Sequence, residues 1–179
     1  MEKAHDIGEE IVDMDLDKPS LKLAVASLMA ASYALLTVVL GSFGYSWIQV
    51  RISEALAPLP FLMGFPAVAG LTLGCVLANW FSPIGLPDMV VGSALTLFAA
   101  LLSWKFSFKR KVVACVYPIL VNAFGVSAYV SLFYNVPYPM SVATIALGES
   151  IATMLIGYPL LVALERTGIR VRKNPRTLE

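Results

Sequence analysis

The sequence has 179 residues, of which 58% are hydrophobic and only 14% are charged, and its mean hydropathy is +0.77. Soluble domains are about half apolar and about a quarter charged, so the composition excludes an ordinary soluble domain. It indicates an integral membrane protein, and we expect a lipid bilayer and no nucleic acid among its partners.

The few charges divide the chain into three parts. Residues 1–20 form a polar, acidic N-terminal tail, and residues 166–179 form a basic C-terminal tail. The intervening membrane domain, 21–165, is almost uncharged apart from the basic segment KFSFKRK at 105–111. Ionisable side chains at membrane depth are costly unless they are buried in a bundle or face a wet cavity. The few in the interior are therefore the candidates for function.

A membrane-spanning helix needs about 20 apolar residues, or fewer where it is buried among neighbours. Five segments are clearly apolar enough. The stretch 47–63 contains Arg51 and Glu54, but it is apolar at most other positions and lies between glycine-marked turns. The expected spans, in chain order, are 21–43, 47–63, 65–81, 87–104, 112–134 and 140–164. The sequence thus predicts an all-α integral membrane bundle of six transmembrane helices.

Basic residues gather in cytoplasmic loops. With six spans, the segment 105–111, the basic tail and the N-terminus lie on the same side of the membrane. We therefore predict a multi-pass protein of the cell (plasma) membrane with both termini cytoplasmic. If 47–63 does not cross, the N-terminus lies outside.

In this topology the polar side chains at membrane depth come from different helices, and the charged ones all fall in the outer half. We predict that they form a substrate-binding pocket that opens away from the cytoplasm. Its candidate residues are Arg51, Glu54, Asn79, Asp88, Asn122 and Glu149. Structural alternatives remain open for three features: a purely local Arg51–Glu54 ion pair, a helix cap at Asp88, and an interhelical hydrogen bond from Asn122.

Two stripes of small residues predict close helix packing. Gly70, Gly74 and Ala78 repeat every four residues along the third span, where we expect packing inside the bundle. A second stripe lies on the first span, and it could serve either the bundle or a partner protein. It consists of Ala26, Ala30 and Ala34.

The sequence lacks the G-x-x-x-x-G-K-[ST] loop of ATPases, the H-E-x-x-H motif and the G-x-S-x-G motif. Cys75 and Cys115 lie in apolar runs, and neither has a second cysteine or a histidine at metal-ligand spacing. We therefore expect both cysteines to be buried and to pack as small apolar side chains. We predict no enzyme activity, no metal and no cofactor in this chain. A small bundle with a polar pocket and no energy source of its own is typical of a binding subunit.

Four ordered motifs carry a family resemblance. These are QVRISEAL followed by LP, then AVAGLTLGCVLAN, DMVVGSALTLFAALL and GESIATMLIGYPL. Over residues 24–164 the chain resembles the QueT family, the queuosine-precursor-specific S components of energy-coupling factor (ECF) transporters. The resemblance implies a six-helix substrate-binding subunit that works with a T component and two ATP-binding cassette subunits, which use the ATP. It also implies that Ala26, Ala30 and Ala34 meet the T component.

The substrate implied by the resemblance, a 7-deazaguanine base, suits the polar residues. A guanine-like edge offers two adjacent N–H donors that one carboxylate can accept. Glu54 and Glu149 are the candidates for this edge, Arg51 and Asn79 for the carbonyl, and Asp88 for a cationic substituent.

Two other functions remain possible on the sequence alone. One is an autonomous proton-coupled secondary transporter of a small nucleobase-like or vitamin-like solute. The other is a non-transport subunit whose charged side chains only stabilise the helix bundle.

Overall fold

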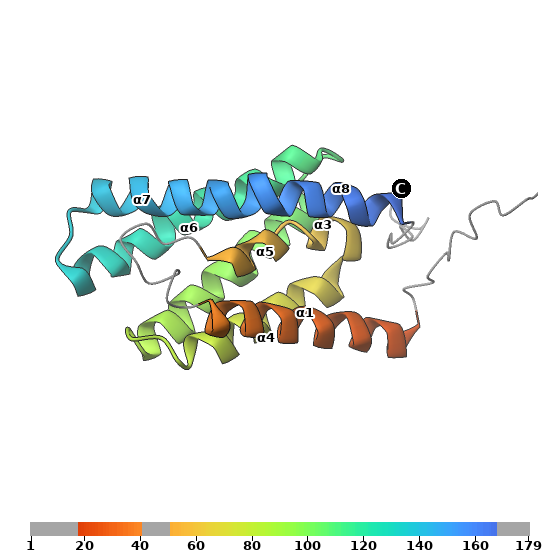
Figure 1. The fold of residues 1–179 in the computed structure, drawn as a ribbon, viewed down its shortest axis with the longest axis horizontal. Helices are drawn as coiled ribbons and strands as arrows, with labels where there is room; N and C mark the ends of the chain where they lie inside the picture. Colours follow the sequence, from red (N-terminus) through yellow and green to blue (C-terminus); the bar gives the residue numbers. More distant parts are fainter. Residues whose placement is uncertain (1–17, 41–50, 168–179) are drawn as a thin grey trace, which may run out of the picture.

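The computed structural model describes residues 18–40 and 51–167, and every regular element in these ranges is helical (Figure 1). Single-turn 3-10 and π segments interrupt or extend the α-helices at three places. In chain order the elements are α1 (Pro19–Val39), the 3-10 turn η1 (Ile52–Leu56), α3 (Pro60–Met63), α4 (Phe65–Asn79), the π turn η2 (Asp88–Gly92), α5 (Ser93–Lys105), α6 (Lys111–Tyr134), α7 (Tyr138–Ser150), the π turn η3 (Ile151–Gly157) and α8 (Tyr158–Arg166).

Within the described residues, four continuous helices are long and apolar enough to cross a bilayer, and all four coincide with predicted spans. They are Pro19–Val39, Asp88–Lys105, Lys111–Tyr134 and Tyr138–Arg166. The other two predicted spans correspond to shorter apolar helices, Ile52–Met63 and Phe65–Asn79. The all-α membrane fold is confirmed, whereas the count of six spans stays a prediction.

The stretch predicted to span at 47–63 is short and broken. Residues 47–50 lie outside the described part of the chain, and the rest forms η1 and α3 around buried Pro58 and Pro60. Proline removes a backbone donor and crowds the preceding turn, so it prevents one continuous helix here. Gly64, with φ of +67°, then reverses the chain into α4, in a conformation that glycine adopts without strain.

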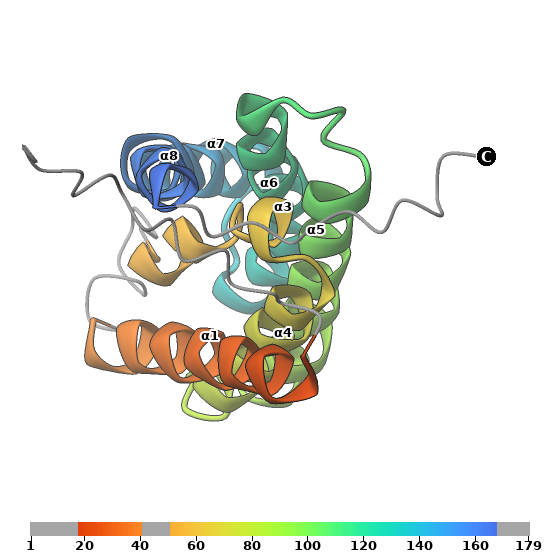
Figure 2. The same cartoon turned by 90° about the vertical axis from the view of Figure 1, so that its right-hand side faces the viewer.

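The helices run back and forth along one long axis (Figure 1). Viewed along that axis, α1 and α4 lie on one side, α6 and the α7–α8 helix lie on the other, and η1 lies between α1 and α7–α8 (Figure 2). The short segment that carries Arg51 and Glu54 is therefore placed inside the bundle by the long helices around it.

The described basic residues other than Arg51 gather at one end of the bundle, where α1 begins and α8 ends (Figure 1). Lys111 and Glu165 form an ion pair there. Most of both predicted tails, 1–20 and 166–179, lies outside the described residues, as do residues 41–50.

The small-residue stripes of α1 and α4 pack against each other. A Cβ atom added to Gly70 would lie 2.4 Å from the carbonyl oxygen of Ala26, and one added to Gly74 would lie 2.7 Å from that of Ala30. The expected internal packing of the α4 stripe is confirmed. On α1, Ala26 and Ala30 contribute backbone to this same contact, and Ala34 lines an apolar groove beside α4. The T-component role of this stripe stays a prediction.

Replacing Gly70 by alanine should destabilise the bundle, because the new methyl group would meet the Ala26 backbone and the Cβ atom of Met29, which cannot rotate away. Overpacking of this kind costs about 1–3 kcal/mol. Thermal unfolding of the purified protein in detergent should show a lower Tm for Gly70→Ala. Ala31→Leu adds more volume on the exposed face of α1 and serves as the control, since it should leave the Tm unchanged. Equal melting of both variants would contradict the packing described above.

Candidate functional site

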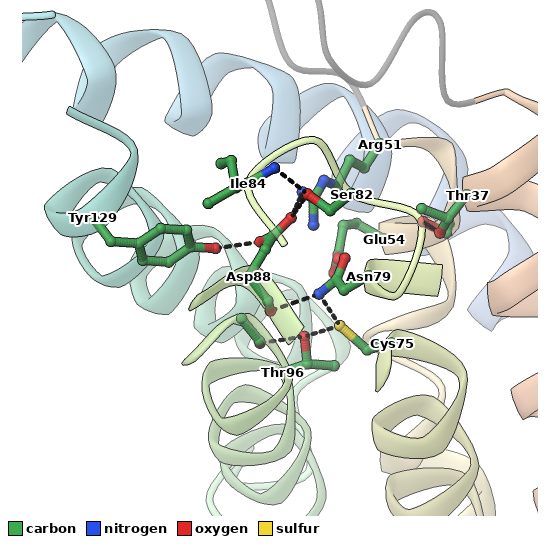
Figure 3. A network of polar contacts seen from close by, with 12 residues as sticks. Thr37, Arg51, Glu54, Cys75, Asn79, Ser82, Ile84, Asp88, Thr96 and Tyr129 are labelled. Atoms are coloured by element: carbon green, nitrogen blue, oxygen red, sulfur yellow. Dashed lines mark hydrogen bonds and ion pairs between the residues drawn. The ribbon is translucent and has the colours of Figure 1, made fainter. Parts of the chain in front are cut away.

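An ion pair between Arg51 and Asp88 lies inside the bundle (Figure 3). A guanidinium nitrogen of Arg51 donates to Oδ2 of Asp88 at 3.2 Å, and the Asp88 side chain is fully buried. Ser82 donates to the same oxygen at 2.6 Å, and Tyr129 donates to Oδ1 at 2.6 Å. Three donors from three separate parts of the chain thus stabilise one buried carboxylate.

Asp88 is held in place by its own backbone surroundings. It begins the π turn η2, and the Asn79 amide donates to its backbone oxygen at 2.9 Å. Gly92, one turn later, has no Cβ, and an added one would lie 3.0 Å from both Asn79 Nδ2 and Asp88 Oδ1. π turns frequently occur at functional sites, and this one directs Asp88 into the network.

The structure decides between the functional and the structural alternatives for Asp88 as a helix cap and for the local Arg51–Glu54 ion pair. The N-cap of η2 is Pro87 rather than Asp88, and the Asp88 carboxylate binds Arg51, Ser82 and Tyr129 instead. The ion pair within hydrogen-bonding distance joins Arg51 to Asp88, from a different helix, rather than to Glu54 three residues away.

Side chains of α1 hold the segment that carries Glu54. The Tyr33 hydroxyl donates to Glu54 Oε1, and Thr37 donates to Ser53 Oγ at 2.7 Å. Arg51 directly precedes η1, and its side chain and that of Glu54 line the same cavity. Glu54 is 2% exposed, and its position depends on α1 as well as on η1.

Glu149 reaches the same region from the end of α7. Asn122 of α6 donates to its Oε1 at 2.9 Å, which is the interhelical hydrogen bond considered for Asn122. Among the described residues no donor reaches Oε2 of Glu149, although this atom is buried. The π turn η3 follows directly, and its Gly157 lets η3 approach the backbone of Ala55, since a Cβ there would lie 2.7 Å from the Ala55 oxygen.

A small cavity joins these side chains. Its volume, counted as space open to the centre of a water molecule, is about 10 Å³, which suffices for about one water. Four of the six predicted site residues line it, together with residues of η2, α5, α6 and α7. The lining consists of Arg51, Glu54, Gly92, Thr96, Asn122, Val126, Ile145 and Glu149.

The other two predicted residues, Asn79 and Asp88, lie behind this lining. Asn79 donates to backbone and to Cys75 Sγ, and Asp88 holds Arg51 (Figure 3). Both therefore support the residues of the cavity rather than line it. The cavity is also much smaller than the open pocket expected from the sequence.

Several members of the network were not found by sequence reasoning. Tyr33, Ser82, Thr96 and Tyr129 are all buried and all donate to charged or sulfur acceptors. A signal existed for the tyrosines, because a buried tyrosine hydroxyl usually has a partner. The sequence could not indicate which partner.

Cys75 is buried, as expected, but it is more than a small apolar residue. Its sulfur accepts hydrogen bonds from Asn79 and Thr96 at 3.3 Å (Figure 3). The Tyr33 hydroxyl, which donates to Glu54, lies 3.7 Å from the same sulfur. Cys115 is buried and free. Over the ranges 18–40 and 51–167, no group of metal-binding side chains is found.

An apolar helical bundle that encloses ionisable side chains around a central cavity has the properties of a membrane protein with an internal polar site. The sequence model of the QueT transporter family matches residues 23–166, and the chain belongs to this family. The match confirms the resemblance found in the sequence and indicates a transport role rather than catalysis. A search of curated proteins and a search of solved structures found no match.

Asp88→Asn should destabilise the protein far more than Tyr129→Phe. The first change leaves the Arg51 guanidinium without its paired charge inside the bundle, which costs about 3–5 kcal/mol for a buried pair. The second removes one hydrogen bond, worth about 1 kcal/mol. Tyr134→Phe, at an exposed position on the same helix, is the matched control. The Tm in detergent should be lowest for Asp88→Asn, slightly lowered for Tyr129→Phe and unchanged for Tyr134→Phe. Equal Tm values for Asp88→Asn and Tyr134→Phe would exclude a structural role for the ion pair.

Proposed function

We propose that this chain is the substrate-binding S subunit of an ECF-type importer and that it takes up a queuosine precursor, a 7-deazaguanine base. The observation that carries the proposal is the cavity lined by Arg51, Glu54, Asn122 and Glu149 in a chain that belongs to the QueT transporter family. Transporter families place substrate sites in the bundle interior, and this cavity contains both acceptors and donors for a purine-like edge.

The proposed recognition uses the carboxylates as acceptors. The ring N–H and the exocyclic amino group of a deazaguanine are adjacent donors, so one carboxylate can accept both. Glu54 and Glu149 are the candidates, and the Arg51 guanidinium is the candidate donor to the base carbonyl. Tyr33 and Asn122 orient the two carboxylates through hydrogen bonds.

Binding must be accompanied by movement of the cavity walls. Ligand pockets commonly measure roughly 300–1,000 Å³, whereas this cavity measures about 10 Å³. A bicyclic base therefore enters only if η1 and the helices around it move apart. The short length of Ile52–Met63 and its proline-broken form favour η1 as the segment that moves.

In this proposal the chain is oriented with its basic end in the cytoplasm, where the ATP-binding subunits act. Two faces of α1 are available for the T component: the predicted stripe at Ala26, Ala30 and Ala34, which already contacts α4 in part, and the exposed face with Ala24 and Ala31. The exposed face is the more accessible of the two.

The purified chain should bind a 7-deazaguanine base stoichiometrically without any partner. Glu54→Gln should weaken binding by at least about tenfold, because truncating a buried charged contact costs about 2 kcal/mol or more. Isothermal titration in detergent measures both affinities, and mass spectrometry of the copurified ligand identifies the natural one. Glu165→Gln, the same substitution at the basic end of the bundle, is the control and should bind like the unmodified protein. Unchanged affinity in Glu54→Gln would refute this site.

Uptake into proteoliposomes should require the T component, both ATPase subunits and ATP. This requirement follows because the binding subunit has no nucleotide-binding loop of its own. Vesicles that contain this chain alone should accumulate no base when a proton gradient is imposed. Gradient-driven uptake by the chain alone would replace the proposal with a proton-coupled secondary transporter.

A further inference from the structure

The basic end of the bundle carries a large excess of positive charge. Among the described residues, seven cations lie at this end, and the acidic residue beside them is Glu165, which pairs with Lys111. Seven cations and one carboxylate give this end a formal charge of +6. The cations are Lys18, Lys22, Lys105, Lys109, Arg110, Lys111 and Arg166.

The connection between α5 and α6, residues 106–110, combines two of these cations with aromatic side chains. Phe108 is 77% exposed and Phe106 is 50% exposed, and Lys109 and Arg110 are exposed as well. Phe108 and Lys109 have positive φ angles of 47° and 61°, which residues other than glycine seldom adopt. Within 18–40 and 51–167, neither Lys109 nor Arg110 forms an ion pair. This connection therefore offers both positive charge and apolar surface to a partner.

The sequence that precedes α1 has the complementary properties. Residues 1–17 contain seven acidic residues and one lysine, a formal charge of −6 with the histidine neutral. More than half of the twelve acidic residues of the chain lie in this short stretch. Apolar residues stand between the acidic ones, at Ile7, Ile11, Val12 and Leu16. The N-terminal segment, residues 1–17, thus matches the α5–α6 connection in charge and in apolar character.

The N-terminal segment is attached to the bundle at the basic end itself. It leads directly into Lys18, which precedes α1, and α1 begins at the end of the bundle where α8 finishes (Figure 1, Figure 2). The Lys111–Glu165 ion pair places the start of α6 beside the end of α8. Seventeen residues can reach at most roughly 55–60 Å, which is several times the spacing of about 8–10 Å between packed helices. The attachment holds the segment near the basic surface at an effective concentration of about millimolar.

We propose that the N-terminal segment binds to the basic end of its own chain, with the α5–α6 connection as its main contact. Its carboxylates pair with Lys109 and Arg110, and its apolar residues cover Phe106 and Phe108. Anionic lipid headgroups also bind basic residues at a membrane surface. The covalent attachment favours the N-terminal segment over them, and the segment shields the basic end from other anionic partners. This contact is separate from the central cavity.

Zero-length cross-linking of the full-length protein in detergent tests the contact. A carbodiimide joins a lysine amine to a carboxylate only when the two groups touch, and mass spectrometry identifies the joined residues. We expect Lys105 and Lys109 to be joined to carboxylates of residues 1–17. The yield should fall steeply between about 50 mM and about 500 mM salt, because salt screens exposed charges. Cross-links confined to Lys18 and Lys22, which follow the segment directly in the sequence, would overturn the inference.

Charge variants of the basic surface separate pairing from mere attachment. Arg110→Glu leaves the amine of Lys109 as the reporter and should lower its cross-linking yield at least about threefold, because one attractive charge becomes repulsive. Arg110→Lys keeps the charge and is the matched control, in which Lys109 should cross-link as in the unmodified protein. Since Arg110 is exposed, both variants should keep the Tm of the unmodified protein. An unchanged Lys109 yield in Arg110→Glu would contradict the proposed pairing.

Variants of the N-terminal segment test the same contact from the other side. Asp13→Asn, Asp15→Asn and Asp17→Asn, combined in one chain, leave four carboxylates in residues 1–17 as reporters. The yield of Lys109 with these four should fall at least about threefold. The three corresponding changes to glutamate keep the charge and should keep the yield. Equal yields in the two triple variants would show that the charge of the segment is irrelevant and would overturn the inference.

Nanodiscs distinguish the N-terminal segment from lipid headgroups as the group that occupies the basic end. The cross-links should persist in nanodiscs of phosphatidylcholine and in nanodiscs that also contain phosphatidylglycerol. Loss of the cross-links only when phosphatidylglycerol is present would assign the basic end to anionic headgroups and would overturn the inference. None of these measurements depends on binding of a deazaguanine base, so their outcome and that of the proposed function are independent.

Discussion

The structure depends on the ion pair between Arg51 and Asp88, because a guanidinium can remain inside an apolar bundle only when a carboxylate and further hydrogen bonds compensate it. Asp88 binds Arg51, which directly precedes η1, Ser82 from the turn after α4, and Tyr129 from α6. This one carboxylate therefore fixes the relative positions of three parts of the chain. The cavity exists where these parts meet.

The irregular helical turns have a common effect on the site. The 3-10 turn η1 carries Glu54, the π turn η2 begins with Asp88 and ends at Gly92, and the π turn η3 follows Glu149. An α-helix turns by about 100° per residue, whereas a 3-10 turn turns by about 120°. An irregular turn therefore changes the direction of the side chains on one side of it relative to those on the other. Close approaches at Gly92 and Gly157 permit this geometry, since a Cβ at either position would meet neighbouring atoms.

The helix α1 links the site to the outer surface of the bundle. One face packs its backbone against Gly70 and Gly74, and from the same helix Tyr33 and Thr37 reach η1. The opposite face is exposed. A displacement of α1 would therefore alter the support of Glu54 directly, which gives a physical route by which contacts on α1 could affect ligand binding.

The sequence by itself determined the membrane class, the all-α fold and the family, because composition and long apolar runs report burial in lipid without knowledge of contacts. It also singled out Arg51, Glu54, Asn122 and Glu149, since charged and amide groups are conspicuous in an apolar chain. Only the tertiary structure decided that Arg51 pairs with Asp88, that Asn79 and Asp88 lie behind the cavity, and that Tyr33 and Tyr129 complete the network. These pairings join residues 21 to 41 positions apart in the chain. Helical periodicity relates neighbours three or four residues apart and carries no information on such contacts.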